Sequence, residues 1–278
     1  EFTTEKKVTL KNLLNHSGGV TVHGFFGYRS DLTLPTLVEI LNGSSPANSD
    51  AILVDQIPGE GHRYSGGGFT IVQQMMIDTE EKTFPLLMKE LVLQPLNMNN
   101  STYDQPLQHA QSKTAATGYL DDGSMVLGKS FIYPEMAAAG LWSTAEDLAK
   151  FVIDIQQTFK GKTNTVVSRS TTNEMLTPLM EGGGPALGIF ISNMKNETYF
   201  FHNGWIQGFC SEFIAHKEKG YGVVVLINSN HPEFISELIR SVALTYQWDE
   251  YITRFRKLKL DLNETEKIEG RYRSNDEN

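Results

Sequence analysis

The stretch Tyr64-Ser65-Gly66-Gly67-Gly68 places a tyrosine and three glycines at the start of a predicted helix that runs to Asp78. Two further stretches put a histidine and glycine at the end of an element. His16-Ser17-Gly18-Gly19 ends the first predicted helix, and His202-Asn203-Gly204-Trp205 ends a predicted strand. Each stretch alone has a structural interpretation, as a core tyrosine or a buried histidine at a turn. Gly204 also indicates that something approaches the backbone of its strand closely.

Charge and composition exclude several classes of function. The 278 residues suit one large domain, and 33 acidic against 24 basic side chains give a net charge of −9. Nucleic acids and anionic membranes require a basic surface, so neither is an expected partner. The glycine-rich turn lacks the lysine of a phosphate loop and the spacing of a dinucleotide fingerprint. The single cysteine rules out an internal disulfide and leaves the redox compartment open.

No metal, cofactor or membrane span is expected either. No cluster of histidines and cysteines has the spacing of zinc ligands. The longest apolar runs are short, such as Val223–Ile227, whereas a membrane helix needs about 20 apolar residues.

The first two thirds of the chain predict helices and loops. Thr9 is a candidate N-cap for a short helix, and Pro35 is placed in the first turn of a helix that ends at Gly43. Helices are also predicted over 68–78 and 84–93, followed by a loop-rich stretch to Pro134. Ser143-Thr144-Ala145-Glu146 resembles a capping box that opens a further helix.

The last third predicts an antiparallel sheet and one helix. Short runs rich in aromatic and β-branched residues, joined by turns, predict three or four strands: Leu187–Ile191, Tyr199–Phe201, Phe209–His216 and Tyr221–Ile227. A helix over 232–248 would pack on this sheet through Phe234, Leu238, Val242 and Tyr246, which recur every four residues. The predicted class is therefore α+β, a helical region plus an antiparallel sheet covered by a C-terminal helix.

In this order and spacing, the three stretches resemble the penicillin-recognising serine hydrolases, the superfamily of class C β-lactamases, DD-peptidases and related esterases. Residues 8–19 are similar to the family's Thr-Leu…Leu-Leu…His helix, and residues 139–148 to its Ala-Gly-Gly-Leu-x-Ser-Thr-x-x-Asp-Leu segment. The resemblance runs from about Val8 to Trp248. It implies a β-lactamase/transpeptidase-like fold for a hydrolase domain over residues 1–250.

The resemblance also implies an active site. Tyr64 matches the tyrosine of the family's Tyr-x-Asn motif, which shares the role of general base and then protonates the leaving group. His202, Asn203 and Gly204 match the Lys-Thr-Gly or His-x-Gly motif, and the N–H of Trp205 would be half of the oxyanion hole. Because a phenol ordinarily titrates near pH 10, Tyr64 would need a positive neighbour to act as a base near neutral pH.

Two departures from the family motifs bear on the substrate. Gly66 stands where the Tyr-x-Asn motif has the asparagine that meets a substrate amide, and His202 replaces the lysine of the third motif. Both favour the esterase and peptidase branches over a true β-lactamase. Trp205 either lines an apolar acyl pocket with three aromatic residues of an early loop or belongs to the core with them: Phe25, Phe26 and Tyr28.

The nucleophile is the part of the pattern that the chain does not match. The family's Ser-x-x-Lys motif comes before the Leu-Leu…His helix, and the one such sequence here, Ser192-Asn193-Met194-Lys195, lies after Tyr64 in a predicted hairpin turn. We therefore expect a preceding segment to supply Ser-x-x-Lys, and the chain by itself to be inactive. Residues 251–278 are expected to be a charged linker leading into a further β domain, or a frayed tail.

The leading hypothesis is a serine hydrolase that cleaves an ester, amide or lactam bond of a small-molecule or peptide substrate through an acyl-enzyme. The alternative is a non-catalytic member of the same fold that binds a peptide, a cell-wall fragment or a partner protein. The resemblance implies a periplasmic or secreted protein.

Overall fold

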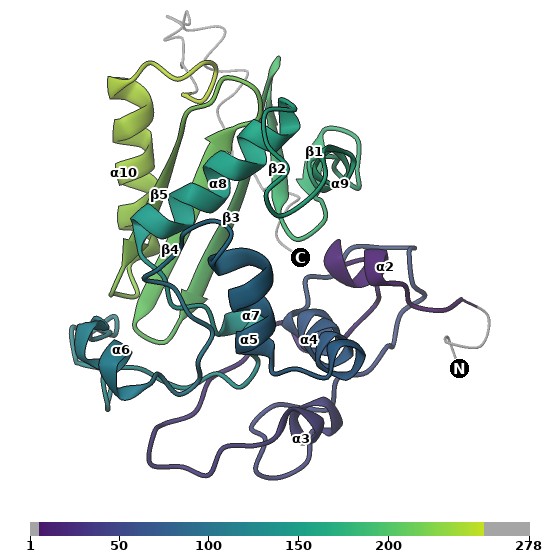
Figure 1. The fold of residues 1–278 in the computed structure, drawn as a ribbon, viewed down its shortest axis with the longest axis vertical. Helices are drawn as coiled ribbons and strands as arrows, with labels where there is room; N and C mark the ends of the chain where they lie inside the picture. Colours follow the sequence, from purple (N-terminus) through teal and green to yellow (C-terminus); the bar gives the residue numbers. More distant parts are fainter. Residues whose placement is uncertain (1–5, 253–278) are drawn as a thin grey trace, which may run out of the picture.

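The computed structural model describes residues 6–252. Helices dominate the first part of the chain and gather at one end of the molecule, below the sheet in the view of Figure 1. In chain order, the helices of residues 6–252, including α8, α9 and α10 beside the sheet, are α2 (Leu10–Leu14), α3 (Leu37–Asn42), α4 (Gly66–Glu80), α5 (Phe84–Met88), the π-helical η1 (Lys89–Leu93), α6 (His109–Thr114), α7 (Met136–Ala139), α8 (Ala145–Phe159), α9 (Arg169–Met175) and α10 (Pro232–Thr245).

The sheet follows the sequence order, because each strand pairs with the next through a tight antiparallel connection. Its strands are β1 (Gly183–Pro185), β2 (Phe190–Met194), β3 (Glu197–Ile206), β4 (Phe209–His216) and β5 (Gly222–Ile227). The predicted α+β class is confirmed, and β4 has the predicted bounds. β3 is longer than predicted, β1 was not predicted, and β2 begins three residues later than Leu187 because Gly188 has a left-handed backbone, with φ of +74°.

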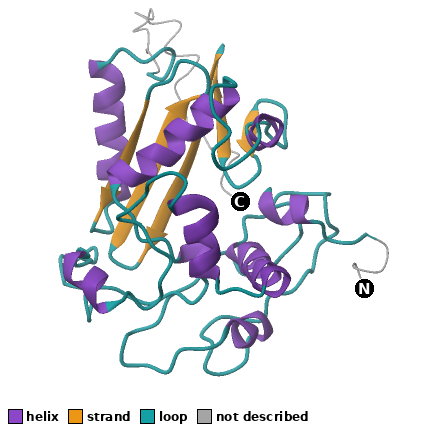
Figure 2. Cartoon of the chain, viewed as in Figure 1, coloured by secondary structure: helices purple, strands orange, loops and turns teal. Residues whose placement is uncertain are grey.

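Helices cover both faces of the sheet, as the alternation of side chains requires (Figure 2). Phe200, Phe213 and Ala215 pack with Val152 and Ile155 of α8. The intervening residues of β3 and β4 pack on α10, with this second cluster comprising Tyr199, Cys210, Ile214, Val225, Ile235, Ile239, Ala243 and Trp248. The sheet is therefore the centre of a three-layer arrangement rather than a layer covered on one side only.

The packing face of α10 is shifted by one residue from the predicted one, although the predicted Val242 does pack against the sheet cluster. Ile235, Ile239 and Ala243 are buried, whereas Phe234 and Tyr246 are 56% and 75% exposed. Two neighbouring stripes of the helix recur every four residues, and the choice of the larger side chains selected the outer one. The inner stripe of Ile235, Ile239 and Ala243 is the one that packs against the sheet.

The helix starts also differ from prediction in two places. Thr36 caps α3, and its side chain and that of Glu39 form a capping box, so Pro35 precedes the helix instead of opening it. Thr144, not Ser143, caps α8 by accepting the N–H of Asp147. Thr9 caps α2 as predicted. The predicted linker over 251–278 lies almost wholly outside the described residues.

Candidate active site

Tyr64 lies at the junction between a loop and α4, with its ring among other aromatic rings. The centroid of its ring is 4.2 Å from that of His16 and 4.9 Å from that of His23. His16 is the residue after the C-cap of α2, and α2 packs beside α4 (Figure 1). The packing of these two helices therefore brings the first and second sequence stretches together.

The glycines after Tyr64 allow a neighbouring segment to cap α4. The N–H of Gly66 donates to the carbonyl of His23 at 2.9 Å, and that of Gly67 donates to the carbonyl of Val22 at 3.0 Å. A Cβ on Gly67 would lie 2.8 Å from the carbonyl oxygen of Thr21, so only glycine permits this approach. The first N–H groups of α4 are thus satisfied within the protein, and Gly66 has no free backbone donor for a substrate.

Strand β3 brings the third stretch to the same region. β2 pairs with β3 only as far as Phe201, so in the described part of the chain the edge of β3 from His202 onwards has no strand on that side. The ring of Phe190, at the start of β2, lies 5.6 Å from His202 and 6.3 Å from Tyr64. Phe190 therefore connects the helical side of the site to the end of β3.

His16 and His23 lie against the Tyr64 ring, and His62 and His202 are further neighbours of His16. Burial, with the neighbouring imidazoles of His62, His202 and His23, lowers the pKa of His16 to about 4. Burial also lowers the pKa of His62 and of His202.

Burial raises the pKa of Tyr64 above its ordinary value, which is the wrong direction for a base. The positive neighbour that the sequence argument requires is therefore not supplied by the buried imidazoles.

The serines near Tyr64 have structural roles. Ser65 caps α4, because its Oγ accepts the N–H of Gly68 at 3.1 Å and donates to the carbonyl of Thr21 at 2.7 Å. Ser17 Oγ donates to Asn15 Oδ1 at 2.7 Å. Neither hydroxyl faces a lysine in these contacts.

The single Ser-x-x-Lys sequence lies away from this site. Ser192 lies opposite Tyr199 in the sheet, about 10 Å along β3 from His202 at about 3.4 Å per residue. Lys195 forms the turn at the far end of the β2–β3 hairpin and pairs with Glu250. This geometry agrees with the rejection of Ser192 as the nucleophile.

Aromatic side chains join the early loop to the end of β3. Tyr133 Oη donates to the carbonyl of Phe26 at 3.4 Å and accepts the N–H of Gln207 at 3.2 Å. Phe26 and Trp205, in the two joined segments, are 69% and 65% exposed. Both rings are accessible to a substrate, whereas Tyr28 is buried in the core.

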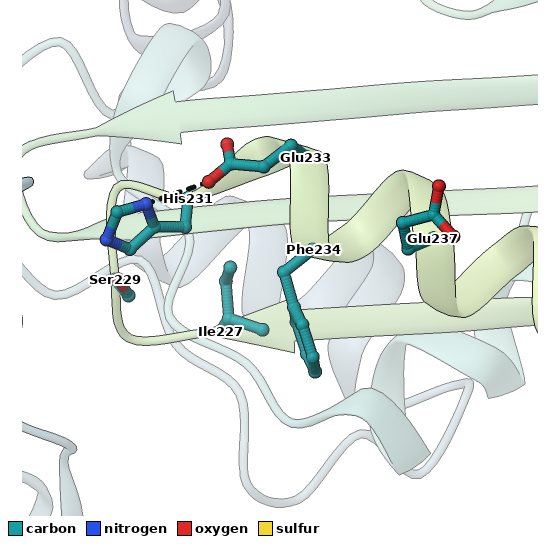
Figure 3. Close-up of a pocket in the computed structure, with 6 residues that line it drawn as sticks. All are labelled: Ile227, Ser229, His231, Glu233, Phe234 and Glu237. Atoms are coloured by element: carbon teal, nitrogen blue, oxygen red, sulfur yellow. Dashed lines mark hydrogen bonds and ion pairs between the residues drawn. The ribbon is translucent and has the colours of Figure 1, made fainter.

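A surface pocket lies elsewhere, between the end of β5 and the start of α10 (Figure 3). It has a volume of about 520 Å³, and Ile227 and Phe234 supply its apolar surface. None of the predicted site residues lines it. In residues 6–252, no group of three or more His, Cys, Asp or Glu side chains is arranged to hold a metal ion, and no helix is long and apolar enough to span a membrane.

Sequence reasoning missed Phe190 and His23 as neighbours of Tyr64. Phe190 has the pattern of an ordinary strand residue, and nothing in its sequence context distinguishes it. His23 follows Val22, a β-branched residue with φ of +61°. Such strain cannot be read from sequence, although in a structure it often marks a functional site.

The fold and these motifs define an α+β scaffold of the penicillin-recognising serine hydrolase class. The chain belongs to the Beta-lactamase family, whose profile matches residues 2–247. No curated protein matches the chain.

Solved structures with the same fold have low sequence identity. A penicillin-binding protein homologue from Pyrococcus abyssi, described as octameric, is 22% identical with a TM-score of 0.65, and the match covers 90% of this chain and 60% of that one. D-amino acid amidase from Ochrobactrum anthropi, complexed with D-phenylalanine, is 19% identical with a TM-score of 0.67, covering 86% and 72%. A β-lactamase/D-alanine carboxypeptidase from Pseudomonas syringae is 15% identical with a TM-score of 0.65, covering 88% and 72%.

Proposed function

We propose that this chain carries the Tyr64 and β3 sides of a serine hydrolase active site that cleaves an ester, amide or peptide bond through an acyl-enzyme. The observation that supports this most is the convergence of Tyr64 and His202 around Phe190 on a Beta-lactamase fold. The hydrolases among the similar structures support the reaction class.

The proposed reaction needs a serine from outside the described residues. Its hydroxyl proton passes to the Tyr64 phenolate as Oγ bonds to the substrate carbonyl carbon. Tyr64 then returns the proton to the leaving group as the bond to that group breaks, and water hydrolyses the acyl-enzyme. The backbone N–H of Trp205, on the exposed end of β3, would stabilise the oxyanion.

The lysine of a Ser-x-x-Lys motif would also lower the pKa of Tyr64. Burial raises the pKa of this phenol, and an ammonium group about 4–6 Å away lowers the pKa of an acid by favouring its ionised form. We propose that the motif lysine lowers the pKa of Tyr64 in this way. We also propose that the protein is exported to the periplasm or the exterior.

We propose that the substrate lacks the amide side chain that β-lactam substrates carry. Gly66 has no side chain to meet a substrate amide, and its N–H already donates a hydrogen bond to the backbone carbonyl of His23. The exposed rings of Phe26 and Trp205 would suit an apolar acyl or aromatic group.

A substrate panel tests this function on the full-length protein. p-Nitrophenyl esters and D-amino acid amides should be hydrolysed faster than a chromogenic cephalosporin. Tyr64→Phe and His202→Ala should each slow hydrolysis by about 10² to 10⁴, the range for losing an acid or base. The exposed residues Tyr246→Phe and His109→Ala serve as controls, and equal rates in all five proteins would contradict the proposal.

A non-catalytic binding role is the second candidate. The raised pKa of Tyr64 favours it, because a phenol without a positive neighbour stays protonated near neutral pH. Tight binding of a peptide or muropeptide by a full-length protein that hydrolyses none of the panel would favour this candidate.

A further inference from the structure

His16 contacts three consecutive residues, Arg63, Tyr64 and Ser65, through both its backbone and its side chain. The carbonyl oxygen of His16 accepts the N–H of Arg63 at 2.9 Å, and His16 Nδ1 accepts the N–H of Ser65 at 3.1 Å. Between these two hydrogen bonds, the imidazole packs against the phenol ring, with 31° between the ring planes. His16 is 4% exposed, so these contacts exclude water.

The backbone of His16 is strained, and this conformation lets its carbonyl and its imidazole accept the hydrogen bonds from Arg63 and Ser65. Its φ is +58°, in the left-handed region that few residues other than glycine adopt. The neighbouring residues hold it there, since Ser17 Oγ bonds both Asn15 Oδ1 and Asn12 Nδ2. Strain that its surroundings enforce in this way is typical of functional positions.

The hydrogen bond to Ser65 also defines the state of the imidazole. Nδ1 can accept an N–H only when it carries no proton, so the proton of neutral His16 is on Nε2. Burial lowers the pKa of His16 to about 4, and the acceptor is therefore available throughout the neutral range. With Nδ1 occupied and its basicity low, His16 is not itself the base.

We propose that His16 is a positioning residue for Tyr64, and that its Nδ1 hydrogen bond to the Ser65 backbone fixes the phenol in the orientation that proton transfer needs. This inference rests on the proposed function. In that reaction a single phenolic oxygen must receive the serine proton and then deliver it to the leaving group, so it has to face two atoms in turn. A displacement of about 1 Å can cost a factor of about 10² in rate.

Two substitutions separate the acceptor from the ring. His16→Asn retains a hydrogen-bond acceptor at the place of Nδ1 and tolerates the left-handed backbone, but it loses the stacked ring. His16→Phe retains a ring against Tyr64 and leaves the buried N–H of Ser65 without a partner. His109→Phe, at an exposed position on α6, is the matched control.

The test measures kcat and KM for p-nitrophenyl ester hydrolysis by the full-length protein, with urea unfolding of each variant. We expect His16→Phe to lower kcat by about 10- to 100-fold with KM nearly unchanged. His16→Asn should retain a kcat at least about ten times that of His16→Phe, because the acceptor is restored.

Two results would overturn the inference. One is equal kcat in wild type and both variants, and the other is His16→Asn as slow as His16→Phe while it unfolds at the wild-type urea concentration. Tyr64→Phe is measured in parallel. If Tyr64→Phe hydrolyses at the wild-type rate, the proposed function fails, whereas a slow Tyr64→Phe with both His16 variants unaffected refutes only the role of His16.

Discussion

Replacing Glu135 by glutamine should remove a pH dependence from the stability of the fold. Glu135 is the N-cap residue of α7, is fully buried, and neither of its carboxylate oxygens has a hydrogen-bond partner. Burial raises the pKa of this carboxyl from 4.5 to about 7. Burial is the main cause that raises the pKa of the Tyr28 and Tyr133 phenols, and the nearby charge of Glu135 adds to it.

The direction of the effect follows from proton uptake. Between pH 4.5 and about 7 the native protein holds a proton on Glu135 that the unfolded chain has released. The free energy of unfolding therefore falls as pH rises through this window and is level above it. At about 1.36 kcal/mol for each pH unit, the full loss is about 3 kcal/mol, of which about 2–3 kcal/mol falls between pH 5 and pH 8.

Urea unfolding of wild type and Glu135→Gln at pH 5 and pH 8 measures this loss. The stability of the variant relative to wild type should increase by about 2–3 kcal/mol between the two pH values, because other titrating groups cancel in the difference. Glu181→Gln, at an exposed loop position before β1, should show no such change. A relative stability of Glu135→Gln that stays constant within about 0.5 kcal/mol would refute the argument.

Three further substitutions test the packing. Ile239→Ala should lower the free energy of unfolding by about 2–5 kcal/mol, while Leu238→Ala, on the outer stripe of α10, should cost at most about 1 kcal/mol; urea unfolding that ranks them in the opposite order would contradict the assigned helix face. Gly27→Ala should destabilise the protein by about 1–3 kcal/mol, since φ at Gly27 is +75° and a Cβ there would lie 2.5 Å from the ring of Tyr133. An unchanged thermal midpoint for Gly27→Ala would show that the loop yields without cost.

Local patterns predicted the elements whose sequences contain their own signals. Thr9 with Asn12 caps α2, and the run from Phe209 to His216 forms β4 with the predicted bounds. The short helices α6, α7 and α9 were missed because they have few apolar residues or only four residues in all. β1 consists of two glycines and a proline, which no strand pattern would select.

The residues of the candidate site likewise include some that the sequence could predict and some that it could not. Tyr64 and His202 could be selected because their glycine-rich surroundings are unusual and their order resembles a family. The His16 stretch was selected for the same reason, but its stacking on Tyr64 across 48 residues of sequence depends on tertiary packing. Phe190 could not be selected, since it reaches Tyr64 only through packing across 126 residues. The raised pKa of Tyr64 likewise depends on burial, which no local pattern encodes.

We propose that Tyr64 activates a serine for acylation, and covalent labelling of the full-length protein tests this role most directly. A fluorophosphonate probe followed by peptide mass spectrometry should find one modified serine, and Tyr64→Phe should be labelled about 10² to 10⁴ times more slowly than wild type. Labelling of no serine, or labelling of Tyr64→Phe at the wild-type rate, would contradict the claim.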